Sequence, residues 1–340
     1  MKHALIAALT IAALAAPLAH GDSVSAHGEA ASVYDETRGT LRAHVLRLIN
    51  RDRALDHLPP VELDVAASAL ADAYCREQIV NHTTGHFTLD GLAPYMRYSF
   101  AGGNDGISEN AAAWSATYAF SDRALYELVR RSEDAMMAEM APHDGHRKTI
   151  LDPYATHVGI GLAWDNSHQR GEFRLVHEFV RRYVDWTRPL PRRAQLTDAV
   201  LLAGKPLRGM RIAGITVHHE PFPHPLDVVT ANRLDSYALP ASRREYLPRL
   251  KTTYSRRDDG TLAVNVQQYA NGSRGDFRVG DDGAFSFSVP FADGAGIYTV
   301  VVWVQKPGNA TSPIAASNIS IRVDAATPAG LGQTAAGGRR

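Results

Sequence analysis

The sequence predicts an α+β domain followed by an all-β domain. In the first half, segments with apolar residues at helical spacing come first, and alternating strand-like segments come last. In the second half, an Asp-Gly turn joins two alternating runs and further short runs follow, which is typical of a β-sandwich of immunoglobulin type. At 340 residues, the chain is long enough for two domains that each bury a core.

Three helices are expected in the first half, each with apolar side chains at helical spacing. The second has an aspartate as its N-cap, and the third begins at a serine or aspartate. The helices are expected between residue 41 and Pro59, between Asp64 and Val80, and between Ser121 and Pro142. Two alternating strands follow at 158–164 and 173–179, which completes an α+β sandwich.

The N-terminus has the pattern of a secretory signal peptide. Lys2 precedes an uncharged apolar run from Ala4 to Ala19, which is shorter than a membrane span and is interrupted by Pro17. We therefore expect export, with the protein secreted, periplasmic or attached to the cell surface. No later segment is apolar and long enough to predict a transmembrane helix in the mature chain.

Composition changes along the chain give the expected domain limits. Residues 187–194 are rich in proline and arginine and are predicted to be a linker, and the last residues are rich in glycine and alanine. The expected order is a signal peptide at 1–21, a flexible lead at 22–37, the α+β domain at 38–186, the linker at 187–194, the β-sandwich at 195–324 and a disordered tail at 325–340.

Charge and cysteine content exclude some classes of protein. Lys plus Arg and Asp plus Glu each number 36, so the overall charge gives no reason to expect a nucleic acid partner. The single cysteine, Cys75, excludes an internal disulfide. Its place in the middle of an expected helix favours a small buried residue over a reactive thiol.

Three short motifs follow one another in the first half. In the first, His86 is followed by Gly91, Pro94 and Arg97. The second is Ser108-Glu109-Asn110-Ala111, and the third is Gly145-His146-Arg147-Lys148-Thr149-Ile150-Leu151-Asp152-Pro153. In this order, the motifs resemble the bacterial type of the CAP or SCP superfamily, the cysteine-rich secretory, antigen 5 and pathogenesis-related proteins. Ser108 stands where the family has glycine, and Thr149 stands where it has asparagine. The resemblance covers roughly residues 38–186.

The resemblance implies an α-β-α sandwich with a cleft that gathers two histidines and two acidic residues. Carried over by position, it places His86, Glu109 and His146 in the cleft. For the second acid, Glu139 is the nearest candidate.

Two chemistries are open to such a cleft. Neutral imidazoles are common metal ligands and a carboxylate can orient them, so His86 and His146 are candidate ligands of a zinc ion. Zinc with open coordination positions would activate water. Alternatively, the histidines and glutamates form hydrogen-bonded pairs that order the cleft.

Three functions remain open from the sequence. The first is a binding module for a small apolar ligand, a lipid or an envelope component. The second is a zinc-dependent hydrolase or peptidase that uses the same cleft. The third is a structural or adhesive surface protein in which the β domain provides attachment. The sequence holds no Gly-x-Ser-x-Gly elbow, His-Glu-x-x-His helix or nucleotide-binding loop, which favours a role other than catalysis, and we assign no catalytic residue.

Overall fold

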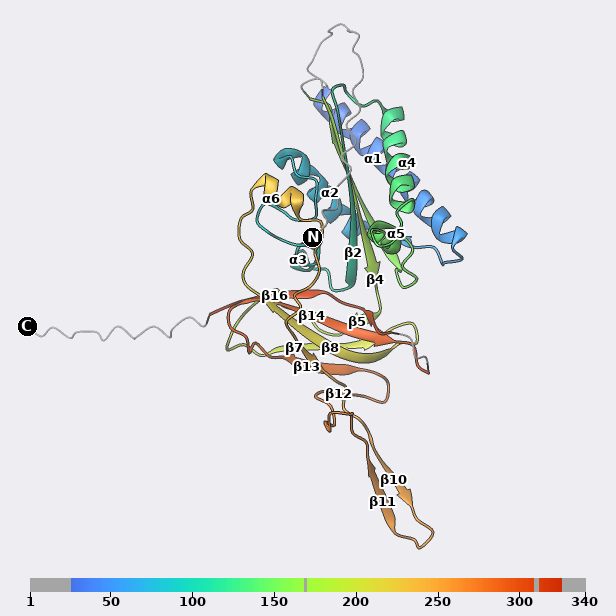
Figure 1. Ribbon diagram of the computed structural model, residues 1–340, viewed down its shortest axis with the longest axis vertical. Coiled ribbons are helices and arrows are strands. Elements are labelled where there is room, and N and C mark those ends of the chain that lie inside the picture. The colour runs from blue at the N-terminus through green and yellow to red at the C-terminus, as the bar shows by residue number, and fades with distance from the viewer. Residues whose placement is uncertain (1–25, 168–169, 309–311, 326–340) are drawn as a thin grey trace, which may run out of the picture.

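The molecule consists of two modules arranged end to end (Figure 1). The computed structural model describes residues 26–167, 170–308 and 312–325, with side chains from residue 34 onward. The expected signal peptide and nearly all of the expected C-terminal tail lie outside the described residues. In the described residues, no helix is both long and apolar enough to span a membrane.

The first module is a four-stranded sheet between two layers of helices. Strands β1 (Glu62–Leu63), β2 (Gly106–Ala116), β3 (His157–Asp165) and β4 (Gly171–Arg181) are ordered β1-β3-β4-β2, so β2 is an edge strand. The helices are α1 (Ala26–Leu55), α2 (Val65–Asn81), α3 (Pro94–Phe100), α4 (Asp122–Met137) and α5 (Gly145–Ile150). Helices α1 and α4 cover one face and α2 covers the other, which confirms the expected α+β class (Figure 1).

The alternation of β3 explains how each face is packed. Val158, Ile160 and Leu162 are fully buried against the α1 and α4 layer. Gly159 and Gly161 occupy the positions of β3 that face α2. A Cβ atom added to Gly159 would lie 2.6 Å from the backbone of Ala67. The two glycines therefore allow α2 to lie directly on the sheet.

The first helix begins earlier than the sequence analysis expected. Residues 26–37 belong to α1, although they were predicted to be a flexible lead. Tyr34 anchors this extension, because its ring lies 4.1 Å from the ring of Trp164 on β3. The expected N-cap Asp64 is confirmed, and α4 begins at Asp122 with Ser121 as its N-cap; each side chain accepts a hydrogen bond from the backbone of the following turn.

The second module is a β-sandwich. One sheet is ordered β12-β13-β7-β5, and the other is ordered β6-β16-β14-β8-β9 with β15 paired to β14. A separate two-stranded hairpin projects from it. The elements are β5 (Val184–Trp186), β6 (Arg193–Gln195), β7 (Val200–Pro206), β8 (Arg211–Glu220), α6 (Val228–Arg233), β9 (Arg243–Tyr246), β10 (Thr252–Arg256), β11 (Leu262–Val266), β12 (Arg278–Val279), β13 (Phe285–Val289), β14 (Gly296–Gln305), β15 (Ile314–Ala315) and β16 (Ile319–Asp324).

Strand pairing places the boundary between the modules earlier than the sequence analysis did. Val184–Trp186 pairs with β7 of the sandwich, whereas residues up to 186 were assigned to the first domain. Arg193–Gln195 pairs with β16, although most of it was assigned to the linker. Only Arg182 and Tyr183 separate β4 from β5, so the two modules are joined almost without a linker.

The modules also share a hydrogen-bonded interface. The backbone of Gly106 donates to Ala316, and Ser99 bonds in both directions with the backbone of Ser320. Ile297 of β14 packs in one apolar cluster with Tyr95 and Met96 of α3. The surfaces through which the two modules contact each other are therefore buried.

Replacing Gly161 with alanine is expected to lower the free energy of unfolding by about 1–3 kcal/mol, because the added methyl group overlaps the backbone of Ala71. Urea unfolding measures this change. The control is Gly39→Ala in α1, where nothing lies within 4 Å and alanine is expected to stabilise the helix by up to about 1 kcal/mol. An equal effect of both substitutions would contradict the close packing of α2 on β3.

Candidate functional site

Two glutamates lie side by side on one face of the first module's sheet. Glu109 on β2 and Glu178 on β4 are directly opposite each other in the antiparallel register. Their side chains therefore leave the sheet on the same face. Both side chains are buried, with exposed fractions of 0% and 5%. No local motif in the sequence marks Glu178.

His86 and Arg97 both contact Glu109. His86 Nδ1 lies 2.8 Å from one carboxylate oxygen, and Arg97 donates to the other. Arg97 also donates to the backbone carbonyl of His86 at 2.5 Å and lies over the ring of Tyr74 at 3.6 Å from its centroid. The spacing of eleven residues in the first motif thus brings the arginine of α3 back to the histidine. We call His86, Arg97, Glu109 and Glu178 the buried centre.

The two carboxyl groups of the buried centre have opposite pKa shifts. Burial opposes the ionisation of Glu109, but the charge of Arg97 and the hydrogen bond from His86 outweigh burial and hold its pKa below the usual range. Burial, followed by the negative charge of Glu109, raises the pKa of Glu178 well above its usual value. Glu178 therefore retains a proton when Glu109 is ionised.

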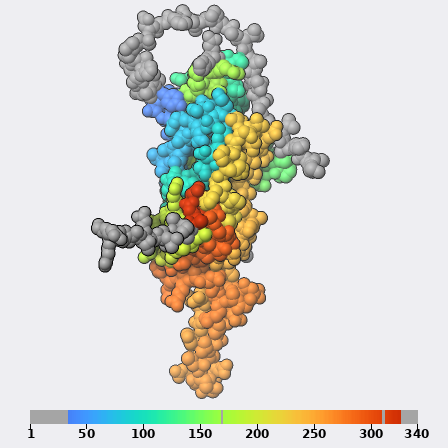
Figure 2. Space-filling model, turned by 90° about the vertical axis from the view of Figure 1, so that its left-hand side faces the viewer, coloured from blue at the N-terminus to red at the C-terminus, as the bar shows by residue number. Residues whose placement is uncertain are grey.

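A segment of the second module covers the buried centre. Residues 221–242, between β8 and β9, run back along the first module, and we call them the strap (Figures 1 and 2). The ring of Tyr237 lies 4.7 Å from that of His86. Its hydroxyl accepts a hydrogen bond from the backbone N–H of Glu109 at 2.6 Å and donates to the carbonyl of the same residue at 2.8 Å.

Further hydrogen bonds hold the strap in place. The backbone of Leu226 donates to the carbonyl of Leu89 at 2.7 Å. Asn232 in α6 accepts from the backbone of Thr84 at 2.8 Å and donates to the carbonyl of His82 at 3.2 Å. The loop that carries His86 is therefore fixed by the second module, and His86 itself is only 9% exposed.

His146 and Glu139 form a second, separate pair. His146 lies at the start of α5, and Glu139 bonds both its Nδ1, at 2.5 Å, and its backbone N–H, at 2.9 Å. The side chain of Asn110 donates to the carbonyl of His146 at 3.0 Å. Because Asn110 follows Glu109 in a regular strand, the two side chains lie on opposite faces of β2. The structure thus arranges the four expected cleft residues as two pairs.

The two pairs do not form a ready-made zinc site. The Nδ1 atom of each imidazole contacts its own glutamate, which orients the ring and leaves Nε2 open to a metal, but Glu109 is also neutralised by Arg97. Within the part of the chain that the structure describes, no three His, Cys, Asp or Glu side chains converge in a way that could hold a metal. A zinc ion shared by His86 and His146 would therefore require the two pairs to move together, and it stays a prediction from the sequence alone.

Cys75 and His177 are both buried without access to solvent. Cys75 is fully buried on α2, and burial raises the pKa of its thiol, so the residue is inert, as expected. His177 is fully buried on β4, with Nε2 3.0 Å from a carboxylate oxygen of Glu133.

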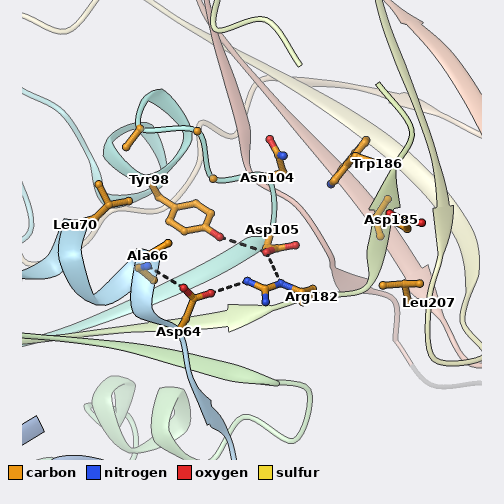
Figure 3. A pocket seen from close by; sticks show the side chains of 15 residues that line it. Asp64, Ala66, Leu70, Tyr98, Asn104, Asp105, Arg182, Asp185, Trp186 and Leu207 are labelled. Atoms are coloured by element: carbon orange, nitrogen blue, oxygen red, sulfur yellow. Dashed lines mark hydrogen bonds and ion pairs between the residues drawn. The ribbon is translucent and has the colours of Figure 1, made fainter. Parts of the chain in front are cut away.

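A pocket of about 450 Å³ opens between the two modules (Figure 3). The first module provides the start of α2 and the loop after α3, and the second provides β5 and Leu207. Arg182 lies in its wall and binds Asp64 at 2.6 Å and Asp105 at 3.1 Å. Tyr98 donates to Asp105 at 3.3 Å. The sequence analysis did not identify this pocket.

Electrostatic effects in the pocket differ between its carboxylates. Burial raises the pKa of Asp105 despite its contact with Arg182. Burial also acts on Asp64, but the hydrogen bond from the backbone of Ala67 and the contact with Arg182 lower its pKa overall. Asp185 is exposed at the rim, and the indole nitrogen of Trp186 is buried without a hydrogen-bond partner. The wall therefore combines acidic groups, aromatic rings and one guanidinium group.

Comparisons with known proteins agree with the resemblance seen in the motifs. Residues 46–179 match the model of the cysteine-rich secretory protein family, CAP. Together with the observed α-β-α layers, this match identifies the first module as a CAP domain. No relative matches among curated proteins.

Two solved bacterial structures are similar to this chain. One is an extracellular protein containing an SCP domain from Bacillus anthracis, with 19% identity and a TM-score of 0.30, covering 41% of this chain and 39% of that one. The other is an outer surface protein from Borrelia burgdorferi, with 15% identity and a TM-score of 0.30, covering 47% of this chain and 99% of that one. The match thus spans about two fifths of the Bacillus protein.

Replacing Glu178 with glutamine is expected to flatten the dependence of stability on pH. Because the pKa of Glu178 is raised on folding, its contribution to stability is fully present below the unfolded pKa, near 4.5, and is lost as the pH rises through the folded pKa. The free energy of unfolding, measured by urea denaturation from about pH 5 to pH 9, should fall less steeply in the variant than in the wild type. The control is the exposed Glu36→Gln. Identical slopes for Glu178→Gln and wild type would contradict a protonated Glu178.

Replacing both His86 and His146 with alanine is expected to leave the zinc affinity of the protein unchanged. Calorimetric titration of the full chain with zinc should give the same isotherm for the wild type and for the double variant His86→Ala, His146→Ala. One equivalent of tight binding that disappears in the double variant would show that the two pairs rearrange into a common metal site.

Proposed function

We propose that this protein is an exported binding protein for a small, uncharged component of the cell envelope that carries sugar-like hydroxyl groups. The observation that carries the proposal is the pocket between the modules (Figure 3). Its volume of about 450 Å³ is within the range of small-molecule sites. The N-terminal signal pattern supports export.

The side chains of the pocket suit a ligand with both apolar and polar parts. Leu70, Leu207 and Val184 provide apolar contacts, and the rings of Tyr98 and Trp186 add flat surfaces for the C–H face of a sugar. Hydroxyl groups both donate and accept hydrogen bonds. They would therefore meet the carboxylates and the guanidinium of Arg182.

The charges in the pocket argue against an anionic ligand. Three aspartates line it, Asp64, Asp105 and Asp185, against the single cation Arg182. Arg182 is already bound to two of these carboxylates, so a phosphate group would find no free positive charge there. The favoured ligand thus carries no negative charge, and its hydroxyl groups distinguish it from the small apolar ligand that was one of the options from the sequence.

The buried centre supports binding over hydrolysis. Hydrolysis requires a reacting group that can reach the substrate, whereas Glu109 is completely buried and already shared by His86 and Arg97. Tyr237 covers the imidazole from the other side. These contacts suit a structural role for the centre, which fixes the edge of the sheet beside the second module.

Nuclear magnetic resonance of the tryptophan indoles tests this proposal. The chain has four tryptophans, so the indole signal of Trp186 is assigned as the one that disappears in Trp186→Phe. Titration with diacetylchitobiose, and separately with octyl glucoside below its micelle concentration, is expected to shift this signal saturably with at least one of the two probes.

A pocket-filling variant provides the specificity test. Ala66 is exposed at the pocket wall on α2, so Ala66→Phe should fill the pocket without disturbing the core and should abolish the shift. The matched control is Ala69→Phe, at an exposed position of the same helix that does not line the pocket. A Trp186 signal that neither probe moves, or equal shifts in both variants, would refute the proposal.

A further inference from the structure

The hairpin formed by β10 and β11 stands apart from the rest of the second module. It projects along the long axis of the molecule, at the end opposite the CAP domain (Figures 1 and 2). Its two strands, of five residues each, pair with each other and form a sheet of their own. A two-stranded hairpin is marginally stable in water unless one of its faces packs against something.

One face of this hairpin is apolar and exposed. The antiparallel register places Tyr254 opposite Val264, Thr252 opposite Val266 and Arg256 opposite Leu262. Since alternate residues of a strand share a face, all six side chains lie on the same side. Four of them are large, apolar and strongly exposed: Tyr254 at 65%, Leu262 at 64%, Val264 at 52% and Val266 at 48%.

The opposite face is different in character. It carries Thr253 opposite Asn265 and Ser255 opposite Ala263. The hairpin is therefore amphipathic, although no part of the described chain covers its apolar face. Such a concentration of exposed apolar side chains marks a surface for interaction.

The charges around the hairpin indicate the kind of partner. Residues 249–274 contain five lysines and arginines and two aspartates, although the whole chain has equal numbers of basic and acidic residues; one of the five, Lys251, is paired with Asp281 at 2.5 Å. Arg256 and Arg257 are exposed beside the tip, and Arg256 belongs to the apolar face itself. Of the two aspartates, Asp259 is held by hydrogen bonds from the backbone and hydroxyl of Thr261.

A second copy of the hairpin is a poor partner for the same reason. Tip-to-tip packing would bring the arginine pairs of two molecules together, beside Asp258 and Asp259 of each. Packing of tip against base would bring Arg256 and Arg257 close to Arg274. The net positive charge of residues 249–274 opposes both arrangements. An anionic surface, in contrast, satisfies the arginines and the apolar side chains at once.

We propose that the β10–β11 hairpin is the contact surface of this protein for an anionic lipid membrane. The apolar face enters the boundary between headgroups and acyl chains, and the basic residues contact the lipid headgroups. The strands are too short to cross a bilayer, and a hairpin with two free edges cannot lie in its core, so the contact is interfacial. This inference is independent of the sugar-binding function proposed above, because the hairpin contributes no residue to the pocket.

Flotation with lipid vesicles tests the proposal on the full chain without its signal peptide. Binding is expected to vesicles that contain phosphatidylglycerol and to be weak with phosphatidylcholine alone. The variant Leu262→Ser, Val264→Ser should lower the partition coefficient at least about tenfold. Replacing Arg256 and Arg257 with glutamine should also weaken binding and reduce its sensitivity to salt.

The matched control removes exposed apolar side chains elsewhere. Val65→Ser, Val80→Ser alters two valines of α2 that are 75% and 76% exposed, and it should bind vesicles as the wild type does. The pocket variant Ala66→Phe should also retain vesicle binding, which separates failure of this proposal from failure of the sugar-binding proposal.

Three results would overturn the membrane contact. One is wild-type protein that does not bind phosphatidylglycerol vesicles. Another is equal binding by the wild type and by the Leu262→Ser, Val264→Ser variant. The third is self-association in analytical ultracentrifugation that this variant abolishes, without any binding to vesicles, which would assign the face to a second copy of the chain.

Discussion

The edge of β2 depends on hydrogen bonds from the second module. An edge strand presents backbone N–H and C=O groups that need partners. Here Asn318 accepts from the N–H of Ile107 at 2.9 Å, and the Tyr237 hydroxyl bonds both backbone groups of Glu109. These contacts fix where the second module lies on the CAP domain. The covering of His86 and the formation of the pocket at the boundary both follow from this placement.

The need to neutralise the buried charge of Glu109 fixes the arrangement of the side chains in the buried centre. A carboxylate as deeply buried as Glu109 is tolerated only with a partner for each oxygen, and His86 and Arg97 provide them. Once that charge is established, a second ionised carboxylate beside it is strongly unfavourable, and Glu178 remains protonated. His86 is thus part of a hydrogen-bonded network that orders the fold, and its ring contacts both Glu109 and Tyr237.

Local signals in the sequence were sufficient to predict most of the helices and strands of the first module. The first motif was sufficient to predict that His86 lies in a buried site. The cap Asp64, the start of α4 near Ser121 and the glycines of β3 depend on neighbours in the chain or on a fixed alternation, so they could be recognised directly. The partnership of Glu178 with Glu109 depends on the register of two strands that are distant in sequence. The role of Tyr237 depends on the docking of one module on another. Neither the pairing of Glu178 nor the role of Tyr237 leaves a local pattern in the sequence. The early start of α1 leaves none either, because it depends on the contact of Tyr34 with Trp164.

The near absence of a linker between β4 and β5 has a mechanical consequence. With only Arg182 and Tyr183 between the modules, and with Arg182 bound to Asp64 and Asp105, a displacement of the sandwich must be transmitted to the start of α2 and to the loop after α3. The two modules would then move together as one rigid body rather than independently. A load applied at one end would reach the other with little loss, and the walls of the pocket would be the first place to deform.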